Sequence, residues 1–320
     1  MSKTIEDKYL GSMIGLAVGD ALGAPVEFTQ KDTFEPIYSY RRGGKFNVDI
    51  GEYTDDTAMT LCLAQSLIEK KGIDQKDQLS KYLKWFEEGY MSANKRSIGC
   101  GKVTLRSLYR YMSKNCSECG NSRLTKGAGN GSLMRIAPVA LFYANNIKLA
   151  MEMAVKSSLT THGLPICSDA SMYMTGLIIG AIEGKSKDEL LSVDYAETVF
   201  DYIENYTFHQ EVVEIAKGDY KNKSRDEIEA KGYVIKTLES ALWAFYNTST
   251  FDEGLILVVN LGDDADTVGA VYGQLAGAYY GIDSIAKEYK ENLMRRELIE
   301  ELALNLILHP INEVDSSSIA

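Results

Sequence analysis

The chain has 320 residues, of which 45% are hydrophobic and 25% charged, a composition typical of a globular protein with a sizeable core. Its 45 acidic and 34 basic residues leave a formal net charge of −11, which argues against nucleic-acid binding, since that needs clustered Lys and Arg. The longest apolar run, Leu10 to Leu22, is interrupted by Asp20 and too short to span a bilayer, and the first residues lack the layout of a secretory signal. We therefore expect a cytoplasmic protein with no membrane partner.

Helical periodicity dominates the chain. Tyr9, Met13 and Leu16 share one face of a first helix, which Gly23-Ala-Pro25 ends because proline lacks an amide donor and restricts the residue before it. The same spacing predicts helices over residues 58–70, 79–90, 105–112, 138–143, 149–158, 168–183, 196–206, 233–246, 267–280 and 292–307. Residues 255–259 are the best strand candidate, although their length does not separate a strand from a buried helix. We predict an all-α fold and a disordered tail over residues 313–320.

The five cysteines are odd in number and scattered, which indicates reduced thiols. Cys116 and Cys119 have zinc-knuckle spacing, but neither a second such pair nor a histidine pair accompanies them. We favour thiols at the solvent edge over a structural zinc site.

Two predicted helices carry a glycine at every fourth residue. The first has Gly11, Gly15, Gly19 and Gly23, and the last but one has Gly269, Gly273, Gly277 and Gly281. Each interior glycine costs a helix about 1 kcal/mol relative to alanine, so the repeats indicate places where backbones approach closely. Tight core packing alone explains this pattern. A sharper interpretation is that these two helices meet each other and fix two acidic clusters relative to one another.

The acidic clusters lie where two helices are predicted to begin. Thr54, Asp55 and Asp56 form the first, and Asp264, Asp266 and Thr267 form the second. Helix capping explains one or two of these residues, because Thr, Asp and the positive end of a helix dipole go together. A site built from both clusters would need protons or cations to offset charge repulsion, and its hard oxygen ligands suit Mg²⁺, Mn²⁺ or Ca²⁺.

Between the clusters, residues 127–138 carry alternate glycines that expose backbone N–H groups able to cradle a phosphate, although a plain loop fits equally well. His162 is the best placed of three histidines, in a turn rich in Ser, Thr and Gly, and a satisfied loop histidine is an equal alternative. The chain has no Gly-x-Ser-x-Gly elbow and no cysteine with a histidine partner nearby in sequence, so nucleophilic catalysis has little support.

Taken together, these segments resemble the ADP-ribosylglycohydrolase family, which includes the dinitrogenase-reductase-activating glycohydrolases and crystallin-like relatives. The matching segments are residues 15–28 (GLAVGDALGAPVEF), 53–59 (YTDDTAM), 127–135 (GAGNGSLMR), 232–239 (GYVIKTLE), 260–269 (NLGDDADTVG) and 273–281 (GQLAGAYYG). They occur in order over most of the chain, which makes the resemblance specific.

The resemblance implies a single orthogonal multi-helix domain over residues 1–312 with two Mg²⁺ or Mn²⁺ ions. Thr54, Asp55 and Asp56 would bind one ion, Asp264 and Thr267 the other, and Asp266 would bridge the pair, while Glu27 matches a mobile glutamate beside the metals. The residues matched to substrate binding are Gly129, Asn130, Gly131, Ser132 and Met134 in the diphosphate and ribose loop, and His162 and Tyr233 in the cleft. Our hypothesis is hydrolysis at C1″ of the distal ribose, with Glu27, Asp55 and Asp266 as catalytic residues.

The leaving group is expected to be a protein side chain, arginine first and serine second, with a modified base or a small ADP-ribosyl compound third, and the protein is expected to be a monomer. One departure concerns arginine: relatives acting on ADP-ribosylarginine usually carry Phe-Asp-Ile-Gly where this chain has residues 97–105 (SIGCGKVTL). Gly99, or Ser97 with a shifted gap, then stands in place of the aspartate.

Two alternatives stay open. A relative that binds ADP-ribose or ADP-ribosylated partners without efficient turnover is one. The other is a haloacid-dehalogenase-type phosphatase, because residues 255–259 precede Asp264-Ala-Asp266-Thr-Val, but that fold needs several parallel strands.

Overall fold

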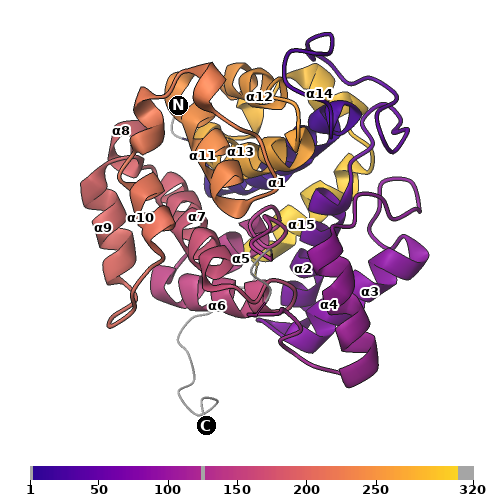
Figure 1. Cartoon of the computed structure of the whole chain (residues 1–320), viewed down its shortest axis with the longest axis vertical. Helices are drawn as coiled ribbons and strands as arrows, with labels where there is room; N and C mark the ends of the chain where they lie inside the picture. Colours follow the sequence, from indigo (N-terminus) through magenta and orange to yellow (C-terminus); the bar gives the residue numbers. More distant parts are fainter. Residues whose placement is uncertain (1–2, 124–126, 309–320) are drawn as a thin grey trace.

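The computed structural model describes residues 3–123 and 127–308, and within these ranges the chain is helical (Figure 1). The first half contains α1 (Ile5–Gly23), η1 (Ala24–Val26), α2 (Asp55–Lys70), α3 (Gln75–Glu88), α4 (Lys102–Lys114), α5 (Ala137–Phe142), α6 (Ile147–Leu159) and α7 (Pro165–Glu183). The second half contains α8 (Lys187–Leu190), α9 (Val193–Asp201), α10 (Gln210–Ala216), η2 (Asp219–Asn222), η3 (Arg225–Glu227), α11 (Val234–Asn247), α12 (Phe251–Val259), α13 (Ala265–Tyr280), η4 (Ile282–Ser284), α14 (Lys287–Asn292) and α15 (Arg296–Ile307). The predicted tail at 313–320 lies outside the described residues.

The all-α prediction is confirmed, since the described residues contain no strand and only two isolated bridges. The strand candidate at 255–259 is wrong: these residues end helix α12, whose first N–H groups are capped by Thr250. Leu255, Val258 and Val259 are buried with helical spacing, but the half-buried Ile256 and Leu257 between them are also apolar, so the sequence shows a continuous apolar run. The phosphatase alternative loses the strand on which it rested.

Helices α1 and α13 run antiparallel through the core with their backbones in contact (Figure 1). A Cβ atom added to Gly15 would lie 2.5 Å from the carbonyl oxygen of Gly273. Gly11 meets Gly277 and Gly19 meets Gly269 in the same way, Gly23 lies against Ala265 and Asp266, and Gly281 at the end of the second stripe lies against side chains of Lys3 and Asp7. The interpretation that these helices meet is therefore confirmed. The C-terminal end of α1 is placed beside the N-terminal end of α13, where the second acidic cluster lies.

Residues 5–26 and helix α7 are long and apolar enough to cross a membrane by length and composition. In both segments 94% of the apolar window is buried inside the protein, which is the environment of core helices.

The prediction of reduced thiols at Cys116 and Cys119 is wrong, because the structure joins them in a disulfide. Helix α4 ends at Asn115 in a left-handed conformation, and the turn that follows brings the two Cα atoms to 5.6 Å, within disulfide range. A bonded pair offers no thiolate to zinc. Cys62, Cys100 and Cys167 are free.

We predict that Gly15→Ala lowers the free energy of unfolding by about 1–3 kcal/mol or more, the usual cost of overpacking a core. The new methyl group would also lie 3.0 Å from the ring of Phe251, so relief requires α1 and α13 to move apart. Chemical denaturation measures the change. An unchanged midpoint would contradict the close packing of these helices.

Candidate metal and substrate site

The site begins with Asp20, a fully buried carboxylate near the end of α1. It accepts hydrogen bonds from the backbone N–H groups of Thr54 and Thr57, both at 2.9 Å, and from their hydroxyls at 2.8 and 2.6 Å. Thr54 itself makes no side-chain cap, so Asp20 supplies the acceptor oxygens for N–H groups at the start of α2. Asp20 is not among the site residues predicted from the sequence, where its signal is a lone carboxylate within an apolar run.

The structure brings the two acidic clusters together. Oxygen atoms of Asp20, Asp56 and Asp266 all lie within 4.8 Å of one another, as do oxygen atoms of Glu27, Asp264 and Asp266. The hydroxyl of Thr267 lies 3.5 Å from a carboxylate oxygen of Asp56 and joins the clusters directly. Helix α13, placed by its packing on α1, thus carries one cluster to the other.

Burial is the main cause of the unusual acid chemistry at this place. It raises the pKa of Glu27 to about 12, with Asp266 and Asp55 as further causes, and that of Asp55 to about 8, with Asp20 contributing. The pKa of Asp264 is raised by burial to about 6, and burial also raises those of Asp56 and Asp266. One oxygen of Glu27 and one of Asp56 are buried without a hydrogen-bond partner. Crowded, desolvated carboxylates with free oxygens fit hard divalent cations.

A cleft of about 480 Å³ opens above these carboxylates. It is lined by most of the predicted residues, namely Glu27, Asp55, Gly129, Asn130, Gly131, Met134, His162, Tyr233, Asp264, Asp266 and Thr267. Thr54 and Asp56 lie beneath it, buried behind the lining. The side chain of Ser132 is also buried behind the lining, where its hydroxyl accepts a hydrogen bond from Ser171 at 3.4 Å.

The glycine loop is tied to the second acidic cluster by Asn130. Its side-chain amide donates to Asp264 at 2.5 Å and to the hydroxyl of Thr237 at 2.8 Å, and its backbone N–H donates to the carbonyl of Gly232 at 3.2 Å. A bridge between Gly129 and Tyr233 completes this join. The loop and the segment before α11 therefore form one wall of the cleft.

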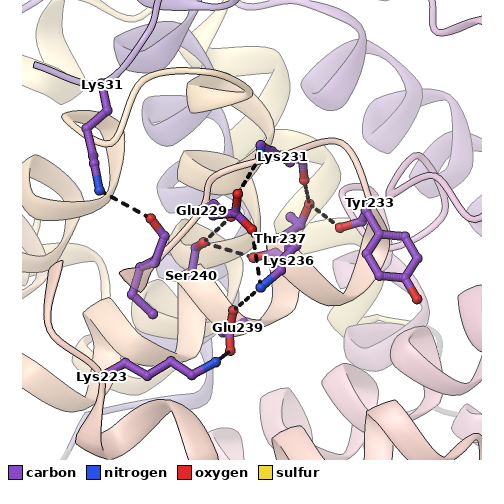
Figure 2. Close-up of polar contacts among 10 residues, drawn as sticks. Lys31, Lys223, Glu229, Lys231, Tyr233, Lys236, Thr237, Glu239 and Ser240 are labelled. Atoms are coloured by element: carbon purple, nitrogen blue, oxygen red, sulfur yellow. Dashed lines mark hydrogen bonds and ion pairs between the residues drawn. The ribbon is translucent and has the colours of Figure 1, made fainter. Parts of the chain in front are cut away.

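A polar network on α11 supports that wall from behind (Figure 2). The buried carboxylate of Glu239 binds Lys223 and, at 3.2 Å, Lys236. The hydroxyl of Ser240 donates to the carbonyl of Glu229 at 3.1 Å, and that of Thr237 donates to the carbonyl of Lys231 at 2.9 Å. Side chains of one helix thus hold residues 228–233, the segment that presents Tyr233 to the cleft.

Two further residues shape the mouth of the cleft. Phe28 adopts a left-handed backbone (φ 61°) uncommon for an aromatic residue, and the residue is 63% exposed, with its ring edge-on to that of Phe46 at a centroid distance of 6.2 Å. Gly99 also has a left-handed backbone (φ 90°), and a Cβ atom there would run into the carboxylate of Asp55. The hydroxyl of Ser97 instead donates to the carbonyl of Phe86 at 2.8 Å. Neither position offers a carboxylate to the cleft.

Comparison with known proteins shows similarity in sequence and in fold. The family model for ADP-ribosylglycohydrolase matches residues 1–314. The chain is 37% identical to the ADP-ribosylarginine hydrolase Tri1 of Serratia proteamaculans (strain 568), over 94% of this chain and 79% of that protein. It is 31% identical to the ADP-ribosyl-[dinitrogen reductase] glycohydrolase of Rhodospirillum rubrum, over 94% and 97% of the two chains.

A solved structure described as an ADP-ribosylglycohydrolase-related protein complex is also similar. It superposes with a TM-score of 0.83 at 39% identity and covers 95% of this chain and 98% of its own. Fold and sequence define a glycohydrolase, and the chain belongs to the ADP-ribosylglycohydrolase family.

We predict that Gly99→Ala weakens binding of Mg²⁺ or Mn²⁺ by about tenfold or more, because the methyl group would displace the Asp55 carboxylate, a predicted ligand. Gly101→Ala is the matched control, since a Cβ atom there meets nothing within 4 Å. Calorimetric titration with each ion compares the two variants. Equal affinities would contradict a role for Asp55 as a ligand.

A second prediction concerns pH. Without a divalent cation, Asp55 and Asp264 have pKa values raised from 3.8 to about 8 and about 6, so the folded state binds these protons more tightly than the unfolded state does. Their contribution to stability is therefore greatest below about pH 4 and is lost as the pH rises through 6 and 8.

Excess Mg²⁺ is expected to oppose that loss, because the cation takes the place of the protons and binds only the folded chain. Melting temperatures measured across this pH range with EDTA and with Mg²⁺ test the prediction. The Mg²⁺ effect should grow with pH, and a constant or absent effect would be the contrary result.

Proposed function

We propose that this glycohydrolase removes ADP-ribose from a modified protein side chain, with arginine as the first candidate and serine as the second, in a reaction that depends on two Mg²⁺ or Mn²⁺ ions. The observation that carries the proposal is the convergence of two buried acidic clusters at the floor of one cleft. The names of the relatives from Serratia proteamaculans and Rhodospirillum rubrum support removal of ADP-ribose from a protein.

The oxygens that would hold the ions come from both clusters. Thr54, Asp55 and Asp56 would hold one, Asp264 and Thr267 the other, and Asp266 both, a set that fits the preference of these ions for hard ligands. When bound there, the ions would supply Lewis-acid chemistry that orients ribose hydroxyls and lowers the pKa of water. Asp20 would act through Thr54, whose position it fixes by hydrogen bonds.

Residues of the chain itself have separate roles along the cleft. The backbone N–H groups of the glycine loop bind the diphosphate, and Asn130 keeps that loop against Asp264. Glu27 lies beside Asp266 with a free buried oxygen, and its ionised form, which divalent cations held beside it would favour, would accept a proton from the water that attacks C1″ of the distal ribose. The bond from C1″ to the modified side chain breaks, and that proton is returned to the leaving nitrogen or oxygen.

Arginine recognition in this chain needs a group other than a carboxylate at position 97 or 99. Phe28 follows Glu27 directly and presents an exposed ring at the cleft mouth, where a guanidinium can stack on an aromatic face. A serine linkage carries no charge to recognise. The ring of Phe28 therefore supports arginine as the preferred leaving group.

The deciding experiment incubates the protein with ADP-ribosylarginine and ADP-ribosylserine peptides, in Mg²⁺ and then in EDTA, and measures released ADP-ribose. We expect release that requires the divalent cation, and a loss of at least about 10³-fold in Asp266→Asn, since this carboxylate lies in both oxygen clusters. Full turnover by Asp266→Asn would overturn the scheme. The second candidate function is that of a relative that binds ADP-ribosylated partners with little catalysis, and the lack of a carboxylate at positions 97 and 99 supports it. Tight binding of ADP-ribose, with no ADP-ribose released from either peptide, would favour this function.

A further inference from the structure

Arg135 carries a charge that the mechanism above does not use. Its side chain is fully buried beneath the glycine loop, and among the described residues it forms no ion pair with a carboxylate. The guanidinium lies over the ring of Tyr82, 4.6 Å from its centroid, and one nitrogen donates to the hydroxyl of Thr161 at 2.6 Å. A buried charge is costly, so a guanidinium without an anionic partner calls for an explanation.

The contact with Arg135 determines which way the hydroxyl of Thr161 points. A guanidinium can only donate hydrogen bonds, so the Thr161 oxygen must be the acceptor and its own proton is directed elsewhere. The partner in reach is Nδ1 of His162, 2.8 Å away. If Nδ1 carried a proton instead, the buried hydroxyl would receive two donors and its own proton would have no acceptor.

His162 is therefore the acceptor at Nδ1. Burial, with Arg135 as a second cause, lowers the pKa of its imidazole to about 3, so the ring is neutral at physiological pH. A neutral imidazole has one N–H group, and with Nδ1 accepting a hydrogen bond the proton is on Nε2.

The Nε2 atom lies on the cleft side of the ring, next to the glycine loop. Cβ atoms added to Gly129 and Gly131 would lie 3.3 and 3.2 Å from it, so the imidazole occupies space that side chains at these positions would fill. His162 lines the cleft, and within the described part of the chain no hydrogen bond occupies Nε2. Its N–H group is thus available to a ligand oxygen.

We propose that Arg135 and Thr161 are positioning residues that hold His162 in the tautomer protonated at Nε2, so that the imidazole donates a hydrogen bond to a phosphate oxygen of the ADP-ribosyl group. The identity of that acceptor rests on the proposed function, whereas the tautomer does not. The buried guanidinium is then explained, because it orients one hydroxyl and adds to the effect of burial that keeps the imidazole of His162 neutral.

The tautomer is measured directly by long-range ¹H–¹⁵N correlation spectra of the full chain, which has three histidines. The resonance that disappears in His162→Gln assigns the ring. We expect a protonated Nε2 and an unprotonated Nδ1 in the native protein. In Thr161→Val, which keeps the shape and removes the hydroxyl, we expect a mixture of tautomers, and in Thr161→Ser the native pattern.

Thr160→Val is the matched control, because Thr160 is equally buried and also accepts from Arg135, at 3.4 Å, but does not touch the imidazole. Binding of free ADP-ribose is measured on the native protein and on Thr161→Val, Thr161→Ser and Thr160→Val. We expect Kd to rise in Thr161→Val by about the inverse of the fraction of His162 that still carries its proton on Nε2, and little in Thr161→Ser or Thr160→Val.

Two results would overturn the proposal: a native His162 protonated at Nδ1, or a Thr161→Val variant whose spectrum and Kd match those of Thr160→Val. A native protein that does not bind ADP-ribose would count against the proposed function and against phosphate as the acceptor, while the spectra would still decide the tautomer.

Discussion

The contact between the backbones of α1 and α13 is the constraint on which the site depends. Because glycines line both helices where they meet, no side chain separates them, and the end of α1 lies against the start of α13. Asp20 on one helix and Asp266 on the other are thereby held near Asp56. If a layer of side chains separated α1 from α13, the two oxygen clusters would move apart. The distances between the carboxylates therefore depend on glycine packing along the whole length of the two helices.

Desolvation is the second physical theme. The carboxylates at the cleft floor are buried and close to one another, which favours their protonated forms and leaves oxygens unpartnered. A cluster of this kind weakens the fold at neutral pH unless a cation compensates it. The same burial and crowding leave carboxylate oxygens free to bind a cation. Stability and ligand binding are thus coupled through one group of residues. Helix α2 takes part in both, because its first turn carries Asp55 and Asp56 and is hydrogen-bonded to Asp20.

Much of this arrangement could be predicted from the sequence. Apolar periodicity indicated the long helices, the glycine stripes indicated the pairing of α1 with α13, and the two acidic clusters pointed to each other because each repeats the same chemistry. Residues 255–259 could not be assigned, because a short apolar run lacks the length that separates a strand from a helix. Asp20 was not identified as a site residue, because it is a single carboxylate within an apolar run. The inward direction of Ser132 could not be predicted, because side-chain direction in an irregular loop depends on packing. The link from Arg135 to His162 spans 27 residues and exists only in three dimensions.

Gly99 bears on how the specificity of this enzyme could change over time. A Cβ atom built on Gly99 would lie 2.1 Å from a carboxylate oxygen of Asp55, and the backbone of Gly99 has a conformation that L-residues with a side chain rarely adopt. Replacing it with aspartate would bring the new Cβ atom against the Asp55 carboxylate in a strained backbone conformation, so an acidic side chain at position 99 requires Asp55 or the turn to move. A variant with an acidic residue there would therefore also change the surroundings of Asp55, which links substrate preference to the acidic clusters at this one glycine.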